Sequence, residues 1–366
     1  MSLTRTHSIG TAPGDGIGPE VMSSGLPVLD LVADRHGFTL DWTEYPWGCD
    51  YFVETGHMMS ADGLERLRQH DALLLGAVGR PDVPDHESLW GLLVPIRKEL
   101  GLCVNYRPCR LLDGLSGPLS HAGDVDLHFV RENAEGEYVD IGGRLYRGRD
   151  ELAIQGAVFT RHGMTAVMEY AFELAEQLGT GVVGATKSNG LMHSMPFWDQ
   201  VFKEVAEQHP SVSATLMHAD ALAALLVLRP ADFGVVVASN LLGDLLSEVG
   251  AAVTGGIGMG PSANLDPGGA SPSLFEPIHG SAPDIAGRDV ANPVGLLWSA
   301  SLMLPQLGEL VAAADLMTAL DVRNPATRTA DLGGPLGTRA ASEAIADALP
   351  PARPSGSARL AKGAQP

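Results

Sequence analysis

The chain has few cysteines, few lysines and few aromatic residues for its 366 positions. Its three cysteines, Cys49, Cys103 and Cys109, form no CxxC pair and no even set, so we expect neither a zinc site nor a disulfide framework. No apolar run reaches the roughly 18 residues that cross a bilayer, and no basic and apolar leader opens the chain. These absences predict a cytoplasmic protein in a reducing compartment.

Basic residues are also scarce, with 24 lysines and arginines against 44 aspartates and glutamates and a formal net charge of −20. This charge argues against nucleic acid or a membrane surface as a partner, although a local basic cluster can still bind a small anion. Apolar residues are plentiful, at 45% of the total, which excludes an intrinsically disordered chain. The length suits about two domains.

Short apolar runs that end in glycine or proline alternate with amphipathic stretches of helical period, which predicts α/β architecture. We expect strands at residues 7–13, 72–78, 181–186 and 235–239, and helices at 19–35, 88–100, 191–209 and 241–252. Two glycine-rich stretches, 142–148 and 255–269, interrupt this alternation. The second is too long and aperiodic for the interior of an element, so it predicts a domain crossing or a ligand loop. The end of the chain, 350–366, is expected to be disordered.

The loop Gly14-Asp15-Gly16-Ile17-Gly18 is similar to the dinucleotide-binding fingerprint GxGxxG, but its glycine spacing differs. An ordinary Rossmann site would also place an acidic residue about 20 residues later, where Asp41 is the nearest candidate. A tight turn between a strand and a helix, which needs glycine, explains the loop equally well.

A few basic residues are candidates for binding anions and moving protons. Arg97, Arg107 and Arg131 could together bind a substrate with two carboxylates, although each alone resembles a surface or salt-bridge arginine. The chain has only four lysines, so twenty of its 24 basic residues are arginines. One of these lysines, Lys187, directly follows a predicted buried strand. A desolvated lysine can lose its proton, so Lys187 is either a catalytic base or a structural lysine at the end of a strand.

Asp244 and Glu248 are four residues apart in a predicted helix and so share one of its faces. Two like charges at this spacing repel each other unless a cation lies between them. Asp220 could supply a third oxygen, and a set made only of oxygens suits Mg²⁺ or Mn²⁺ better than zinc. The alternative is a solvated helix face.

Six separated motifs occur in the order typical of one enzyme family: GDGIGPE, the pair Arg97 and Arg107, VRENAEGEY, TKSNG, SNLLGDLLSE and LFEPIHGSAPDIAGRDVANP. The chain resembles the metal-dependent, decarboxylating β-hydroxyacid dehydrogenases, which include isopropylmalate, isocitrate, D-malate and tartrate dehydrogenases. The resemblance implies a two-domain isopropylmalate-dehydrogenase-like fold with a mixed central sheet, not an ordinary Rossmann fold. It implies a discontinuous cofactor-binding domain, 1–104 and 258–349, and a substrate, metal and dimerisation domain, 105–257.

The resemblance also implies the roles of the charged residues. The three arginines would hold the substrate carboxylates, and Asp220, Asp244 and Glu248 would bind Mg²⁺ or Mn²⁺. Lys187 would take the proton of the substrate hydroxyl, and Tyr138 would protonate the enolate left by loss of CO₂. Lys187 and Asp220 would come from the second subunit of a homodimer. Family members usually have aspartate where this chain has Glu248, so direct contact of Glu248 with the metal is the least secure of these assignments.

NAD is the cofactor that the resemblance implies, because a carboxylate at Asp284 would accept from the ribose hydroxyls and repel the 2′-phosphate of NADP. The other implied cofactor contacts are Asn189, His279, Gly280, Ser281, Ala282 and Asn292. A monovalent cation such as K⁺ could assist.

The substrate prediction depends on Trp90. Isopropylmalate-specific members have a glutamate seven residues before the first arginine, and here that position is Trp90. Its indole would fill the space of an isopropyl group, so we predict a four-carbon diacid, tartrate or D-malate. The alternative for Trp90 is that it merely packs between domains. The alternative for the substrate is that the protein is a 3-isopropylmalate dehydrogenase. A non-catalytic regulatory homologue is a further alternative, but it would be expected to have lost Tyr138, Lys187 or the carboxylates.

Overall fold

A computed structural model describes residues 5–112, 114–115, 117–119, 124–320 and 322–351. The predicted disordered end lies outside the described residues from residue 352 onward. In the described part of the chain, no helix is both long and apolar enough to cross a membrane.

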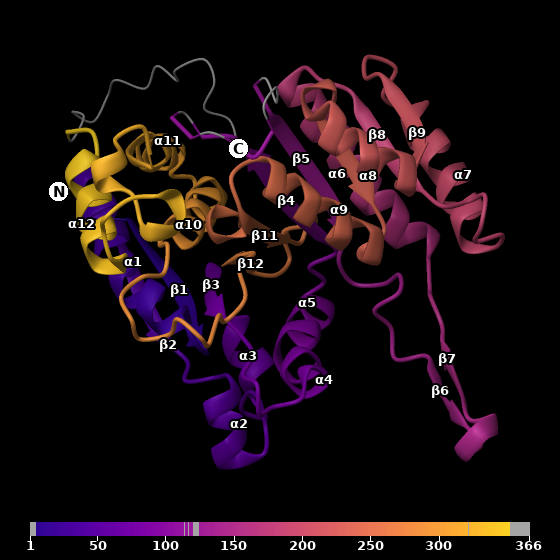
Figure 1. Cartoon of the computed structure of the whole chain (residues 1–366), viewed down its shortest axis with the longest axis horizontal. Coiled ribbons are helices and arrows are strands. Elements are labelled where there is room, and N and C mark those ends of the chain that lie inside the picture. The colour runs from indigo at the N-terminus through magenta and orange to yellow at the C-terminus, as the bar shows by residue number, and fades with distance from the viewer. Residues whose placement is uncertain (1–4, 113, 116, 120–123, 321, 352–366) are drawn as a thin grey trace.

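Most strands belong to one ten-stranded mixed sheet with the order β2-β1-β3-β12-β11-β4-β5-β10-β8-β9 (Figure 1). Strands β11 and β4 each pair antiparallel with both of their neighbours. The other pairings, within β2-β1-β3-β12 on one side and within β5-β10-β8-β9 on the other, are parallel. The bounds are β1 (Arg5–Gly14), β2 (Phe38–Glu44), β3 (Ala72–Ala77), β4 (Val104–Arg110), β5 (Asp126–Glu132), β8 (Val182–Thr186), β9 (Ala214–His218), β10 (Val235–Ala238), β11 (Pro261–Leu265) and β12 (Ser273–Pro277). The predicted mixed α/β fold is confirmed.

Helices cover both faces of the sheet. The first face packs against α1 (Gly18–His36), α6 (Arg161–Leu178), α7 (Ser194–Ala206), α10 (Val294–Gln306), α11 (Leu310–Ala319) and α12 (Thr338–Ala348). The second face packs against two separate groups, which are α2 (Cys49–Thr55), α3 (Gly63–Leu67) and α5 (Val94–Glu99) at one end and α8 (Ala219–Leu228) and α9 (Asn240–Val253) at the other. A short α4 (Asp85–Ser88) and a π-helical segment, η1 (Leu89–Leu93), precede α5.

The alternation of side chains along each strand separates these two faces. Leu74 belongs to the core of the first face, whereas Leu73 and Leu75 belong to the core of the second. The same alternation places Val130 on the first face and Phe129 on the second. Between the two helix groups of the second face, the strands in the middle of the sheet carry polar side chains instead.

A two-stranded ribbon, β6 (Gly142–Leu145) and β7 (Leu152–Gln155), extends away from the body of the molecule (Figure 1). It includes much of the glycine-rich stretch 142–148, where we predicted no element. The residues of β6 and β7 are exposed on both faces, so no burial imposes an apolar and polar alternation on their sequence.

Predicted and observed elements agree at several positions. The four predicted strands correspond to β1, β3, β8 and β10, and α1 and α9 correspond to predicted helices. The helix predicted at 88–100 begins earlier, at Asp85, and the one at 191–209 is shorter, Ser194–Ala206. The prediction for 255–269 was wrong in part, because this stretch contains β11. All five residues of β11 are buried, and its apolar and polar residues alternate over only five positions, too few to mark a strand within a glycine-rich stretch.

The carboxyl ends of the parallel strands β1, β3 and β12 meet at one edge of the sheet. There the loop after β1 contacts the loop after β12, since the Ile17 amide donates to the carbonyl oxygen of Ser281 at 2.8 Å. The Asp15 carboxylate accepts from the amides of Cys49 and Gly79, both at 2.8 Å. Gly16 has a φ of 58°, and a Cβ there would lie 1.9 Å from the Ser281 oxygen. Glycine is therefore required for close approach as well as for conformation.

We expect Gly16→Ala to destabilise the protein more than Gly37→Ala. Both residues have positive φ, but a Cβ at Gly37 would meet nothing within 4 Å. The Gly37 variant should cost about 1 kcal/mol, and the Gly16 variant at least roughly twice that, because it must also push apart two backbones. Urea unfolding measures both. Equal losses would show that the contact with Ser281 does not constrain the loop.

Candidate active site

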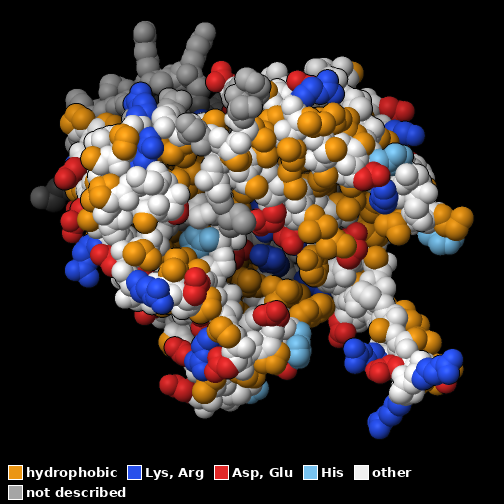
Figure 2. Space-filling view, viewed as in Figure 1, with side chains coloured by type: hydrophobic (Ala, Val, Ile, Leu, Met, Phe, Trp, Pro, Cys, Tyr) orange, Lys and Arg blue, Asp and Glu red, His pale blue; other side chains and the backbone are white. Residues whose placement is uncertain are grey.

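The polar strip on the second face crosses three strands in register. Asn264 of β11 lies opposite Asn105 of β4, which in turn lies opposite Arg131 of β5. Arg107 lies two residues beyond Asn105 and so shares its face. Figure 2 shows a hollow in the middle of the molecule near these strands, with basic and acidic side chains inside it.

Arg97 reaches this strip from α5. Its Nη2 donates to Oε1 of Glu276 on β12 at 2.8 Å, and both side chains are nearly buried. The Nε of Arg97 is buried without a hydrogen-bond partner. A buried donor without a partner is costly, so this atom is suited to binding a ligand oxygen.

Arg107 and Arg131 share one carboxylate. Arg131, whose side chain is 4% exposed, forms a short ion pair with Asp244 of α9, and the Nη2 of Arg107 lies 3.4 Å from the same oxygen. The hydroxyl of Tyr138 donates to the other oxygen of Asp244 at 3.4 Å. The helix can approach Arg131 this closely because residue 243 is glycine, where a Cβ would lie 2.7 Å from the Cβ of Arg131.

Glu248 lies one turn beyond Asp244 on α9, with its Oε1 3.5 Å from the Nη1 of Arg107. Asp244 and Glu248 thus face the same arginine, as their spacing predicted. Asp220 does not join them, and the described residues contain no group of three or more His, Cys, Asp or Glu that could hold a metal ion. Within one chain, the proposed metal ligands are therefore divided.

Lys187 and Asp220 form a second group. The Nζ of Lys187 lies 3.0 Å from Oδ2 of Asp220, where β8 ends and α8 begins. Both side chains are partly exposed, at 35% and 67%. In the described residues, no hydrogen bond or ion pair joins this pair to the arginines.

Trp90 lies in the π-helical segment η1, which leads into the helix α5 that carries Arg97, one member of the arginine group (Arg97, Arg107 and Arg131). The Nζ of Lys98 lies 5.0 Å from the centre of the Trp90 ring and donates to the carbonyl oxygen of Tyr138 at 3.0 Å. Lys98 thus links the indole to the segment that carries Tyr138.

Burial and charge shift the pKa values of this group. Burial, followed by the charge of Arg107, lowers the pKa of Arg131. Burial and then the charge of Asp244 raise the pKa of Tyr138. Burial also raises the pKa of Glu248, against the effect of Arg107. The common cause of these three pKa shifts is that burial removes water from the charged form of each group.

The predicted cofactor residues gather in the loop after β12. His279 is buried, and its Nδ1 lies 3.1 Å from the carbonyl oxygen of Gly280, so this nitrogen must carry the hydrogen. Burial lowers the pKa of His279, which favours the neutral ring. Its Nε2 is then an acceptor, and it is buried without a partner.

Two further predicted cofactor residues lie in the same segment between β12 and α10. Asn292 is buried and donates to Asp331 at 3.0 Å, whereas Asp284 is exposed, close in sequence to Ser281 and Ala282. Asn189 is exposed and lies two residues beyond Lys187, apart from the loop after β12. Asp41, the alternative acidic residue, is exposed on β2.

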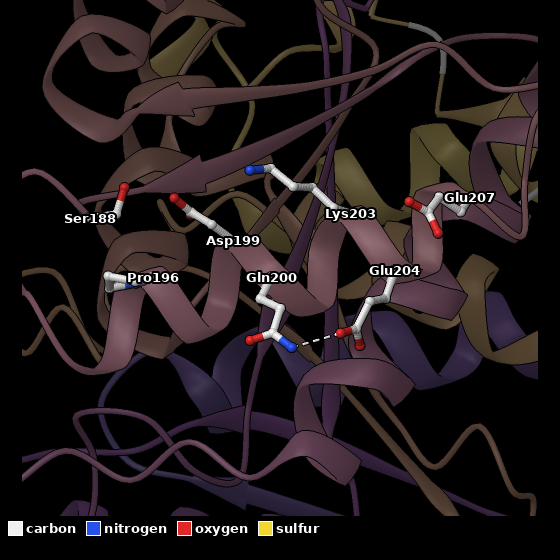
Figure 3. Close-up of a pocket in the computed structure, with 7 residues that line it drawn as sticks. All are labelled: Ser188, Pro196, Asp199, Gln200, Lys203, Glu204 and Glu207. Atoms are coloured by element: carbon white, nitrogen blue, oxygen red, sulfur yellow. Dashed lines mark hydrogen bonds between the residues drawn. The ribbon is translucent and has the colours of Figure 1, made fainter.

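A separate cavity of about 500 Å³ lies along α7 (Figure 3). It is lined by Ser188, Pro196, Asp199, Gln200, Lys203, Glu204 and Glu207, and none of these is a predicted site residue. A hydrogen bond from Gln200 to Glu204, 2.7 Å long, spans part of it. We assign no chemistry to this cavity.

Comparison with known proteins identifies the family. The model of the family described as isocitrate/isopropylmalate dehydrogenase matches residues 8–349. The chain belongs to this family. It is 48% identical over 348 residues to a probable tartrate dehydrogenase/decarboxylase of Bacillus subtilis (strain 168), covering 94% of this chain and 98% of that protein. It is also 48% identical over 312 residues to the D-malate dehydrogenase [decarboxylating] of Escherichia coli (strain K12), covering 84% and 86% of the two chains.

The fold comparison agrees. The crystal structure of isocitrate dehydrogenase from Methylococcus capsulatus superposes with a TM-score of 0.85 at 30% identity, over 93% of this chain and 98% of that one. The resemblance inferred from the six motifs is confirmed, and the chain is a member of a dehydrogenase family.

Several polar residues of the strip were not predicted. Asn105, Asn264 and Glu276 are buried and bond to the arginines or to each other. Glu276 lies inside one of the family motifs, so its position was a signal that we did not use. Asn264 lies in the stretch interpreted as a loop, where the alternation of apolar and polar residues is too short to stand out among the glycines.

Glu132 follows Arg131 and supports the same region. Its carboxylate accepts from the amides of Ala134 and Glu135, and burial raises its pKa to about 7 from the usual 4.5. The folded state therefore binds a proton more tightly than the unfolded state. The stability from this group is complete below about pH 4.5 and is lost as the pH rises through about 7.

We expect Glu132→Gln to become more stable relative to the parent as the pH rises. The relative gain between about pH 5 and pH 8 should be on the order of 3 kcal/mol, because the variant avoids ionising a buried carboxyl group. Urea unfolding at both pH values measures it, with the exposed Glu207→Gln as control. Parallel stability curves for parent and Glu132→Gln would contradict the raised pKa.

Proposed function

We propose that this protein oxidises a small 2-hydroxy diacid, tartrate or D-malate, with NAD and a divalent metal, and that decarboxylation can follow. The observation that carries this proposal is the gathering of three nearly buried guanidiniums beside two carboxylates on one helix face. The names of relatives that are 48% identical, a tartrate dehydrogenase/decarboxylase and a D-malate dehydrogenase, support the same reaction.

The charges of the arginine group fit a dianion bound with a divalent cation. Its three guanidiniums face three carboxylates, those of Glu276, Asp244 and Glu248. Adding a divalent cation leaves two positive charges, which a dicarboxylate would neutralise. A cation that takes Asp244 and Glu248 would also free Arg107 and Arg131 to pair with the substrate.

The donor set fits Mg²⁺ or Mn²⁺ because it consists of carboxylate oxygens. Asp244 and Glu248 of one chain would hold the ion together with Asp220 of a second. When bound, such an ion supplies a Lewis acid for negative charge that develops on the substrate oxygen. The longer side chain of Glu248 would reach the ion directly or through water.

Lys187 would accept the hydroxyl proton while hydride leaves the same carbon for the nicotinamide. If the resulting keto acid loses CO₂, Tyr138 would protonate the enolate. Asp220 lies 3.0 Å from the Lys187 amine and would orient it. The presence of both residues, with the carboxylates, favours an enzyme over a non-catalytic homologue.

A homodimer with a shared site would complete the chemistry, since one chain keeps its lysine apart from its arginines. Apolar side chains are exposed on α8 and α9, notably Leu228 at 72% and Leu245 at 58%. The ribbon of β6 and β7 exposes Tyr146 at 73% and Ile154 at 57%. These surfaces are suited to burial against a second copy of the chain.

NAD would bind at the strand ends beside the loop after β12. The free acceptor on His279 is suited to a ribose hydroxyl, and the exposed carboxylate of Asp284 would repel the 2′-phosphate of NADP. Asn292 and the backbone from Gly280 to Ala282 would complete this part. Asn189 would contact the cofactor of the partner subunit.

We propose residues 1–104 and 258–349 as the cofactor-binding domain and 105–257 as the substrate, metal and dimerisation domain. A monovalent cation such as K⁺ and a cytoplasmic location stay predictions.

A substrate panel tests the proposal. With NAD and Mn²⁺, D-malate or a tartrate isomer should show a kcat/KM at least about tenfold above 3-isopropylmalate and isocitrate, because Trp90 would occupy the space of a larger substituent. Steady-state NADH formation measures it. A clear preference for isopropylmalate would show that the interpretation of Trp90 is wrong, and no turnover of any diacid would refute the function.

Subunit complementation tests the shared site. Lys187→Ala and Asp244→Asn should each abolish turnover, one by removing the base and the other by removing a metal ligand. Co-expressed with different tags and purified as mixed dimers, they should regain up to about half of the parental activity, because one of the two sites contains only native residues. Dimers with Lys187→Ala in both subunits are the control. No recovery in mixed dimers would place Lys187 and Asp244 of one chain in the same site.

A further inference from the structure

A series of hydrogen bonds through buried amides connects two of the arginines proposed to bind the substrate. Arg97 donates to Glu276 at 2.8 Å, and Glu276 accepts from the Nδ2 of Asn264 at 2.8 Å. The Oδ1 of Asn264 accepts from the Nδ2 of Asn105 at 2.9 Å, and the Oδ1 of Asn105 accepts from the Nε of Arg107 at 2.7 Å. This series of hydrogen bonds crosses the sheet from β12 through β11 to β4.

The hydrogen bonds of this series can point in only one direction. A carboxylate such as Glu276 only accepts hydrogen bonds, and a guanidinium such as Arg107 only donates them. Asn264 must therefore present its NH₂ group to Glu276 and its oxygen to Asn105. The orientation of both amides is set by the charged groups at the two ends.

Asn264 forms the most side-chain hydrogen bonds of the residues in this series. It is 0% exposed, its NH₂ group also donates to the carbonyl oxygen of Leu274 at 3.2 Å, and its oxygen also accepts from Asn133 at 2.9 Å. Both donors and both acceptor positions are used. A fully bonded amide in a dry setting is stiff, because any rotation leaves buried groups unpaired.

We propose that Asn264 is a positioning residue that sets the separation of Arg97 and Arg107 and so the fit of a four-carbon diacid. It lies on β11, between the strand that carries Glu276 and the strand that carries Arg107, and its hydrogen bonds in the described part of the chain go to neither arginine. This inference rests on the proposed function, in which the two arginines bind the substrate carboxylates.

The first test replaces the amide by an apolar group of similar size. Asn264→Leu should weaken D-malate binding in the presence of Mn²⁺ by about tenfold or more, because both arginines lose the shared support. The KM for NAD should change much less. Calorimetry of D-malate binding and steady-state kinetics measure the two effects.

Asn133→Leu is the matched control. Asn133 is also a buried asparagine that bonds to Asn264, but it lies on a branch and not between the arginines. It should lower thermal stability by a similar amount while changing D-malate binding less than about threefold. Equal losses of binding in the two variants would overturn the proposal.

Asn264→Asp provides a signature that a merely structural role would not produce. Its carboxylate would face that of Glu276, and two carboxyl groups at this distance ionise in separate steps, the second with a raised pKa. At low pH a shared proton restores the donor to Glu276, and at high pH it is lost. The binding defect relative to the parent should therefore grow between pH 6 and pH 9, and it should also be measurable if the leucine variant does not fold.

The outcomes separate this inference from the proposed function. If the parent protein neither binds nor oxidises any diacid, both fail. If the parent does so and Asn264→Leu binds D-malate equally well, only the role of Asn264 fails. A defect in Asn264→Asp that does not depend on pH would likewise overturn it.

Discussion

The constraint on which the site depends is the burial of three guanidiniums on one face of a sheet. A buried arginine without an anionic partner is strongly destabilising, so each must be bonded in the folded chain. Asp244 forms ion pairs with Arg107 and Arg131, and Glu276 forms one with Arg97. These partners come from α9 and β12, so the positions of the arginines depend on how distant segments pack.

The sheet topology makes this packing possible. The strands β12, β11, β4 and β5 adjoin in space although they come from two separate parts of the chain. Their second face lies between two groups of helices, which leaves a strip where polar side chains replace a core. The fold thereby places its three buried arginines where two separate parts of the chain meet.

Several of the residues that the sequence singled out lie together in the fold, although their roles stay predictions. The pairing of Asp244 with Glu248 followed from helical spacing, and the buried strands β8 and β10 were apparent as apolar runs. The resemblance carried by six motifs supplied the remaining roles, and the family is confirmed. The interpretation of 255–269 was wrong in part, since the apolar and polar residues of β11 alternate over only five positions, without β-branched residues, in a glycine-rich stretch.

The fold class and the family could be predicted from the sequence alone, because apolar runs and spaced motifs are local patterns. Only the tertiary structure showed that Asn264 and Asn105 link the arginines, and that Lys187 and Asp220 stand apart from them in one chain. The physical reason is that local patterns record which face of an element is buried. They do not record which buried polar groups of distant strands become partners, and this depends on strand order and register.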